Sequence, residues 1–155
     1  MSMLFLADAI RRGDRYRIDL EKSERWYKRA ASLGSGRAMY GLGLVHLARR
    51  DLQNAIEAWR SAGERGCGAA MWVLGRLHLH GDGDGGGAPD AGAARAFFER
   101  GASLGHVWST RSLALLLMTG RFGLGQRLRG YDKYLRCFVA MAFAMLGKRV
   151  DPVMR

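Results

Sequence analysis

Small and apolar residues recur every three or four positions along most of the chain, which is the spacing of one face of an α-helix. Two sets with a spacing of four are Ala38, Leu42 and His46, and Ala70, Leu74 and His78. A matching stripe follows the first set at Ala55, Ala58, Trp59 and Ala62. The pattern predicts an all-α protein with helices over about residues 3–12, 16–33, 37–49, 52–65, 69–80, 90–104, 107–119 and 131–147.

The chain is also similar to itself at three places. A glycine recurs where a helix should end, as Gly34, Gly66 and Gly105, at offsets of 32 and 39 residues. The extra residues of the second interval lie in the glycine-rich segment 81–89. A helix commonly ends in a residue of left-handed conformation, which is usually glycine. Each repeat should therefore be a pair of helices joined by a tight turn.

Helical hairpins of this kind bury a continuous core only when several of them pack together. We therefore expect a single domain over residues 1–147, a right-handed α-solenoid of about four antiparallel hairpins. Its units should be residues 16–36, 37–68, 69–106 and a degenerate 107–147, with a cap helix at Met3–Arg12 and a basic tail at 148–155.

The best copy of the repeat combines several short motifs in a fixed order. They are Ala70, Leu74-Gly75, His78, Gly81-Asp82-Gly83, Asp90, Ala94, Phe97-Phe98, Gly101-Ala102 and Gly105-His106. This order resembles the Sel-one-like repeat family, a branch of the tetratricopeptide-like helical repeats, over about residues 20–125. The copy at 38–66 lacks the Gly-x-Gly motif, and His46 and His78 replace the usual aromatic residue.

The resemblance implies a non-enzymatic adaptor that holds a peptide or helix of a partner protein in a concave groove. The candidate groove residues are Tyr40, Leu44, Trp72, Arg76, Trp108 and Arg111. Aromatic residues and Arg are enriched at binding hot spots. Arg76 and Arg111 could clamp a carboxylate, which favours an acidic partner. In a solenoid this short, the groove could instead pack against the chain's own C-terminal helix, or it could have no role.

The positive charge of the chain lies mainly towards its C-terminal end. Residues 1–99 carry 15 basic and 12 acidic side chains, whereas residues 100–155 carry 10 basic and 2 acidic ones. The candidate C-terminal basic surface consists of Arg127, Arg129, Lys133 and Arg136. Such a charge favours acidic partners, although 21 of the 25 basic residues are Arg and an Arg-rich proteome would explain the excess equally well.

The last predicted helix, Tyr134–Leu146, is apolar nearly all round. It could cap the solenoid, form a homodimer or other partner surface, or lie against a membrane surface. The alternative to the groove adaptor is thus a peripheral membrane-associated or dimerising protein. Nucleic acid is not favoured, because the basic residues alternate with few exposed aromatics and no known nucleic-acid-binding module is present.

The segment His78–Asp90 offers imidazoles and carboxylates close in sequence, but it departs from a calcium loop at Gly86 and Ala93, where acidic ligands belong. We expect an enlarged loop between helices there and no metal or cofactor. No nucleophile and base are spaced for catalysis, so no enzymatic activity is expected. Two distant cysteines, with neither a secretory signal nor a membrane span expected, favour a cytoplasmic protein with free thiols.

Overall fold

The computed structural model describes residues 20–83 and 87–145, with side chains described as far as residue 142. The described part of the chain consists of helices joined by short turns, without strands. The helices are α2 (Leu20–Ser32), α3 (Gly36–Ala48), α4 (Leu52–Glu64), α5 (Gly68–His80), α6 (Ala91–Ser103), α7 (Val107–Met118) and α8 (Leu124–Met145). The expected cap helix at 3–12 and the expected basic tail at 148–155 lie outside the described residues.

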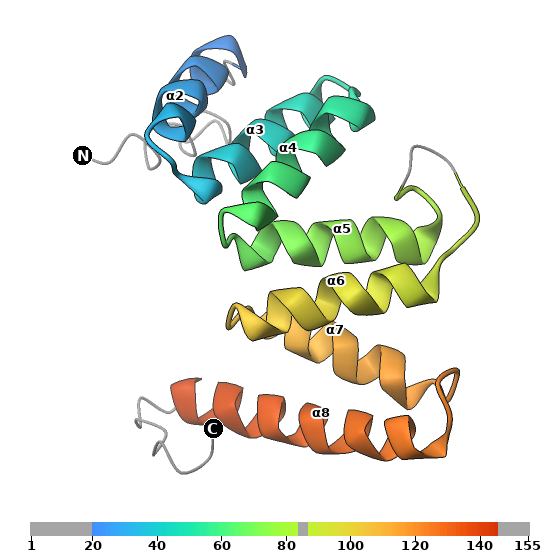
Figure 1. Ribbon diagram of the computed structural model, residues 1–155. Helices are drawn as coiled ribbons and strands as arrows, with labels where there is room; N and C mark the ends of the chain where they lie inside the picture. Colours follow the sequence, from blue (N-terminus) through green and yellow to red (C-terminus); the bar gives the residue numbers. More distant parts are fainter. Residues whose placement is uncertain (1–19, 84–86, 146–155) are drawn as a thin grey trace.

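Successive helices run in opposite directions and stack in the order of the sequence (Figure 1). The hairpins are α3–α4, α5–α6 and α7–α8, and each hairpin also packs on the helix before it. Among the described helices, the one close contact between helices that do not follow each other in sequence joins α5 and α7. The prediction of an all-α solenoid of stacked hairpins is confirmed.

The repeated glycines end three helices as the sequence predicts. Gly34, Gly66 and Gly105 have φ angles of +86°, +81° and +75°, a left-handed conformation that glycine adopts without steric cost. Side chains then begin the next helices: the Ser35 hydroxyl accepts a hydrogen bond from the Ala38 amide, and the Asp90 carboxylate accepts from two amides of α6. These caps satisfy amides that have no partner within the helix.

Within the first two hairpins, a glycine of one helix accommodates an aromatic ring of the other. A Cβ atom added at Gly43 would lie 2.3 Å from Nε1 of Trp59, and one added at Gly75 would lie 2.6 Å from a ring carbon of Phe98. Both rings are almost fully buried, with 1% of their surface exposed. The absence of a side chain at these glycines therefore sets how closely the helices of each hairpin pack.

In the last hairpin the glycine lies on the second helix, α8, and this helix begins earlier than the sequence predicts. The sequence predicts that the last helix begins at about residue 131, yet α8 begins at Leu124 and includes Gly125 and Gly130. A Cβ atom at Gly130 would lie 2.9 Å from the carbonyl oxygen of Ala114 in α7. The prediction was wrong because these glycines resemble helix breakers in the sequence, whereas Gly130 permits the close approach of α8 to α7.

Candidate functional site

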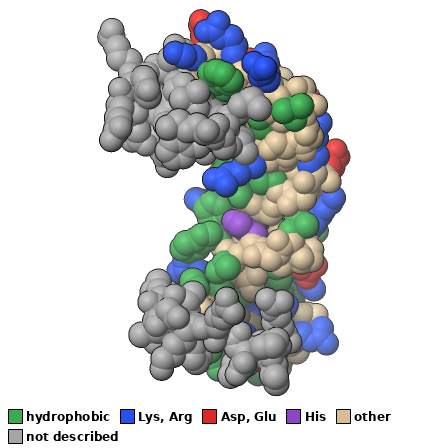
Figure 2. All heavy atoms as spheres, turned by 90° about the vertical axis from the view of Figure 1, so that its left-hand side faces the viewer, with side chains coloured by type: hydrophobic (Ala, Val, Ile, Leu, Met, Phe, Trp, Pro, Cys, Tyr) green, Lys and Arg blue, Asp and Glu red, His purple; other side chains and the backbone are tan. Residues whose placement is uncertain are grey.

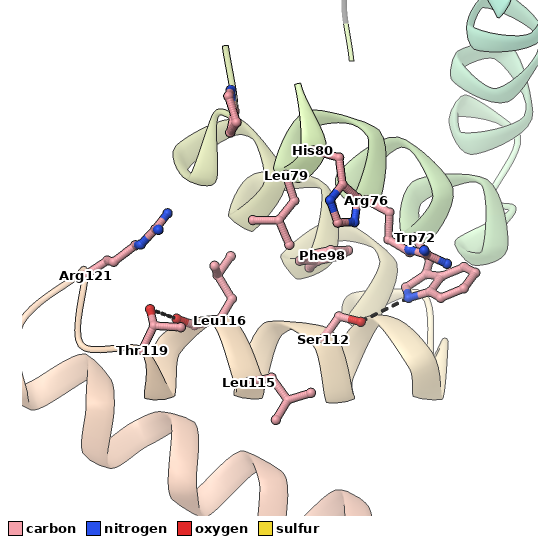
Figure 3. Close-up of a pocket in the computed structure, with 11 residues that line it drawn as sticks. Trp72, Arg76, Leu79, His80, Phe98, Ser112, Leu115, Leu116, Thr119 and Arg121 are labelled. Atoms are coloured by element: carbon pink, nitrogen blue, oxygen red, sulfur yellow. Dashed lines mark hydrogen bonds between the residues drawn. The ribbon is translucent and has the colours of Figure 1, made fainter. Parts of the chain in front are cut away.

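A pocket of about 580 Å³ lies between α5, α6 and α7, on the side of the α5–α6 loop (Figure 3). It is formed by residues of all three helices and by the turns that follow α5 and α7. Its lining consists of Trp72, Arg76, Leu79, His80, Pro89, Phe98, Ser112, Leu115, Leu116, Thr119 and Arg121. The pocket thus spans the contact between α5 and α7, which do not follow each other in the sequence.

Trp72 forms one wall of the pocket and is held on both sides. Its indole Nε1 donates a hydrogen bond of 3.0 Å to the Ser112 hydroxyl of α7. The guanidinium of Arg76 lies 5.0 Å from the centre of the indole ring, a distance typical of a cation–π contact. The indole therefore presents a fixed surface, which reduces the conformational entropy that binding would cost.

The charged side chains that line this pocket are both basic. Arg76 and Arg121 lie around its edge with the imidazole of His80, and no carboxylate is among the described residues that line it. Between these groups, Leu79 and Leu116 point towards each other across the opening (Figure 3). The pocket is therefore suited to a ligand that combines apolar groups with negative charge.

A smaller pocket of about 280 Å³ continues from the first along α5. It shares Trp72, Arg76 and His80 with the larger pocket and extends to Leu47 of α3 and to Asp82. We call the two pockets together the α5 groove. Figure 2 shows another side of the stack, that of the α4–α5 and α6–α7 turns, where hydrophobic patches run through the middle and Lys and Arg side chains gather at the α2 end.

The structure brings only some of the predicted groove residues together. Trp72 and Arg76 line the α5 groove, whereas Tyr40 lines a separate pocket of about 360 Å³. Leu44 packs against the core between α4 and α5 and is partly buried. Trp108 and Arg111 do not line any of the described pockets. The Arg111 guanidinium instead lies 5.6 Å from the centre of the Trp108 ring.

Several residues that line the larger pocket were not predicted from the sequence, among them His80, Pro89, Ser112, Thr119 and Arg121. The prediction placed Arg111 in the groove by counting from the repeated leucine, but α7 turns Ser112, Leu115 and Thr119 towards the pocket. The contact between Trp72 and Ser112 joins two different repeats, so the pattern within one repeat does not predict it. Arg121 follows the end of α7, beyond the part of the sequence that is clearly repeated.

The predicted C-terminal basic surface lies on α8. Arg127, Arg129, Lys133 and Arg136 are all exposed there. Arg136 donates to the Asp132 carboxylate over 3.0 Å, so one of the four positive charges is paired within the helix. In the part of the chain that the structure describes, no helix has the length and apolarity required to cross a membrane.

Cys137 of α8 is buried, and its thiol lies 3.9 Å from the carbonyl oxygen of Val107. Burial raises the pKa of this thiol, while the positive charge of Arg111 acts in the opposite direction. A thiol with a raised pKa is mostly protonated at neutral pH and is a weak nucleophile. This supports a packing role for Cys137.

His106 begins α7 and gives the fold a dependence on pH. Its Nδ1 accepts the Ser109 amide over 3.3 Å, and burial lowers the imidazole pKa below its ordinary value of 6.5. The unfolded chain therefore binds the proton more readily, so stability present at neutral pH should be lost as the pH falls through 6.5 and below. We expect the free energy of unfolding, from urea titrations, to decrease between about pH 7.5 and 5.5.

The variant His106→Asn retains a capping side chain but has no imidazole to protonate, so it should flatten this part of the pH profile. Replacing the exposed His80 by Asn provides the control, and this variant should keep the wild-type slope. An unchanged slope in His106→Asn would mean that another group causes the pH dependence.

Of the two histidines in the segment His78–Asp90, His78 is buried in the structure. Its ring stacks on Phe97 with 5.0 Å between ring centres, and it closely contacts the backbone at Gly83. Among the described residues, no three His, Cys, Asp or Glu side chains gather in a way that could hold a metal ion. His78 acts as a packed core residue of the repeat, and residues 84–86 lie outside the description.

The sequence and the fold were compared with known proteins. The family model described as Sel1 repeat matches residues 1–35, 36–67 and 68–106. A Sel1 repeat protein from Oxalobacter formigenes is similar in structure, with a TM-score of 0.69 and 20% identity, over 87% of this chain and 56% of that one. A protective antigen of uropathogenic Escherichia coli strains, which displays an SLR fold, has a TM-score of 0.68 and 19% identity, over 94% of this chain and 33% of that one.

The chain thus spans about half the length of the first protein and a third of the second. The comparison with curated proteins gives no match. At these identities, the structural likeness establishes the fold, and the family model establishes the repeat. Sel1 repeat proteins are generally scaffolds for protein–protein interaction. On the three matched repeats and the stacked hairpins that they form, the chain belongs to the Sel1 repeat family.

Proposed function

We propose that this protein is an adaptor that holds an acidic, partly apolar segment of a partner protein in the α5 groove. The observation that carries the proposal is the pairing of an apolar lining with basic groups only in the larger pocket. Apolar side chains of the segment would lie on Phe98, Leu115 and Leu116, where burial supplies the main gain in free energy.

The carboxylates of the bound segment would face Arg76 and Arg121. Arg76 is already positioned by its contact with the Trp72 ring, so its guanidinium can donate two parallel hydrogen bonds to a carboxylate with little further ordering. Positive charge around the opening also speeds the encounter with an acidic segment. The affinity should consequently weaken as salt is added.

A random peptide library displayed on phage and selected on the full chain tests the proposal without a known partner. The selected peptides should be enriched in Asp and Glu beside Leu, Ile, Phe or Trp. The affinity of one such peptide is then measured by calorimetry. Selected peptides that are basic or without charge preference would contradict the proposed chemistry of the groove.

Two arginines that contact tryptophans form a matched pair for the mutational test. Arg76→Ala should weaken the peptide by about tenfold or more, since a charged hydrogen bond contributes about 1.5–3 kcal/mol. Arg111→Ala removes a similar contact, at 5.6 Å from the Trp108 ring centre, outside the described pockets, and should change the affinity little. Equal losses in the two variants would locate the bound peptide elsewhere.

A further inference from the structure

Helix α8 carries an uninterrupted row of exposed apolar side chains. The row consists of Leu124, Leu128, Tyr131, Leu135 and Phe138, which we call the α8 stripe. Their exposed fractions are 77%, 71%, 47%, 63% and 57%. Large apolar side chains that are this exposed and also contiguous on one helix are typical of an interaction surface.

Among the described residues, the α8 stripe lies on a face of α8 that no other helix covers. Helices α4 and α6 each pack between two helices, the one before and the one after, whereas α7 is the one described helix against which α8 packs closely. This contact uses Gly130 and Cys137, which are buried on another face of α8. The stripe is therefore available for a second helix.

The spacing within the stripe identifies the shape of its occupant. Its residues are separated alternately by four and three positions. An average separation of 3.5 residues keeps an apolar row facing one partner helix along its whole length, as in a coiled coil. A helix that follows α8 for about four turns would thus cover all five side chains.

We propose that the occupant is α8 of a second copy of this chain, aligned in parallel across a two-fold axis. The charges beside the stripe favour this arrangement. Arg127 and Asp132 flank it on opposite sides and are five residues apart. In a parallel pair of helices, residues with this separation meet across the interface.

Arg127 of each copy therefore meets Asp132 of the partner subunit, so the dimer gains two pairs of opposite charge. An antiparallel pair centred on Tyr131 would instead bring the two Asp132 carboxylates together, which is unfavourable. Asp132 already accepts from Arg136 over 3.0 Å, but both side chains are exposed, and the carboxylate has a second oxygen for Arg127.

The remaining basic residues fit the same arrangement. Arg129, Lys133 and Arg136 are exposed, and at 100° per residue they lie towards the side of α8 that faces away from the stripe. Pairing through the stripe leaves these three charges in water, where they cost little. The dimer also presents the α5 groove twice, which raises the avidity for a partner with two acidic segments.

Sedimentation equilibrium of the full chain tests the proposal. The wild-type protein should dimerise, and Leu128→Glu should raise the dissociation constant by about 100-fold or more, because each dimer then contains two buried carboxylates. Leu33→Glu is the matched control, since Leu33 is 73% exposed but lies outside the stripe. Circular dichroism confirms that each variant is folded. A wild-type chain that stays monomeric overturns the proposal.

Charge exchange tests the parallel register. Arg127→Asp and Asp132→Arg should each weaken the dimer, and the double variant should recover most of the wild-type affinity. A double variant as weak as the sum of the single ones excludes this register. Sedimentation with phosphatidylserine vesicles tests whether the stripe binds a lipid surface instead. If the wild-type chain is monomeric and binds the vesicles, and the Leu128→Glu variant does not bind them, the stripe is assigned to a lipid surface.

Discussion

Replacing Trp59 by Ala should lower the free energy of unfolding by about 3–5 kcal/mol, the range measured for large aromatic residues removed from protein cores. Trp59 is 1% exposed and fills the space above Gly43. Its indole Nε1 also donates to the Tyr40 carbonyl over 3.3 Å, so the substitution also removes this hydrogen bond.

Urea titration followed by circular dichroism measures the effect, and Trp108→Ala is the control. Trp108 is 50% exposed, so its removal should cost much less than that of Trp59. A Trp59→Ala variant that loses no more than the control would show that the first hairpin does not depend on this ring. The stability of the whole domain should fall, since neighbouring repeats stabilise each other.

The second large effect is expected at Gly75, where Ala should destabilise the fold by about 1–3 kcal/mol. In an exposed helix this change stabilises, because Ala has the higher helix propensity. At Gly75, however, the new Cβ atom would lie 2.6 Å from the Phe98 ring, and either the ring or the helix must shift. The steric cost should therefore exceed the gain in propensity.

Gly125 provides a control of opposite sign. It lies in α8 with no atom within 4 Å of an added Cβ, so Gly125→Ala should be neutral or stabilising by up to about 1 kcal/mol. A double variant, Gly75→Ala with Phe98→Leu, should lose less stability than the sum of the single changes, because the smaller side chain relieves the contact. Strict additivity would contradict a direct clash between residues 75 and 98.

The sequence predicts the hairpins well because their boundaries depend on local chemistry. Gly34, Gly66 and Gly105 supply left-handed turns, and five predicted helices agree with α3 to α7 within a residue at each end. The small residues opposite Trp59 and Phe98 recur at the same place in each repeat. Self-similarity therefore reveals the architecture, although no single dipeptide is specific.

The α5 groove is less accessible to such reasoning, because it depends on how α5 and α7 are oriented to each other. Trp72 and Arg76 were predicted from their place in the repeat, but Arg111 lies outside the groove while Ser112 contacts Trp72. Residues 111 and 112 point about 100° apart around α7, so a small difference in the orientation of this helix decides which of them faces the groove. The length of α8 was missed for a related reason, since Gly130 serves a contact with α7 and not a turn.

Because each helix packs mainly on its neighbours in sequence, most local openings of this stack should stay local. The larger pocket of the α5 groove is different, since an occupant touches residues of α5, α6 and α7 at once and would link the second hairpin to the third. A bound segment should therefore stabilise these two hairpins against local opening. Hydrogen exchange would slow in α5, α6 and α7 on binding, while α2, α3 and α4 would keep the exchange rates of the free chain.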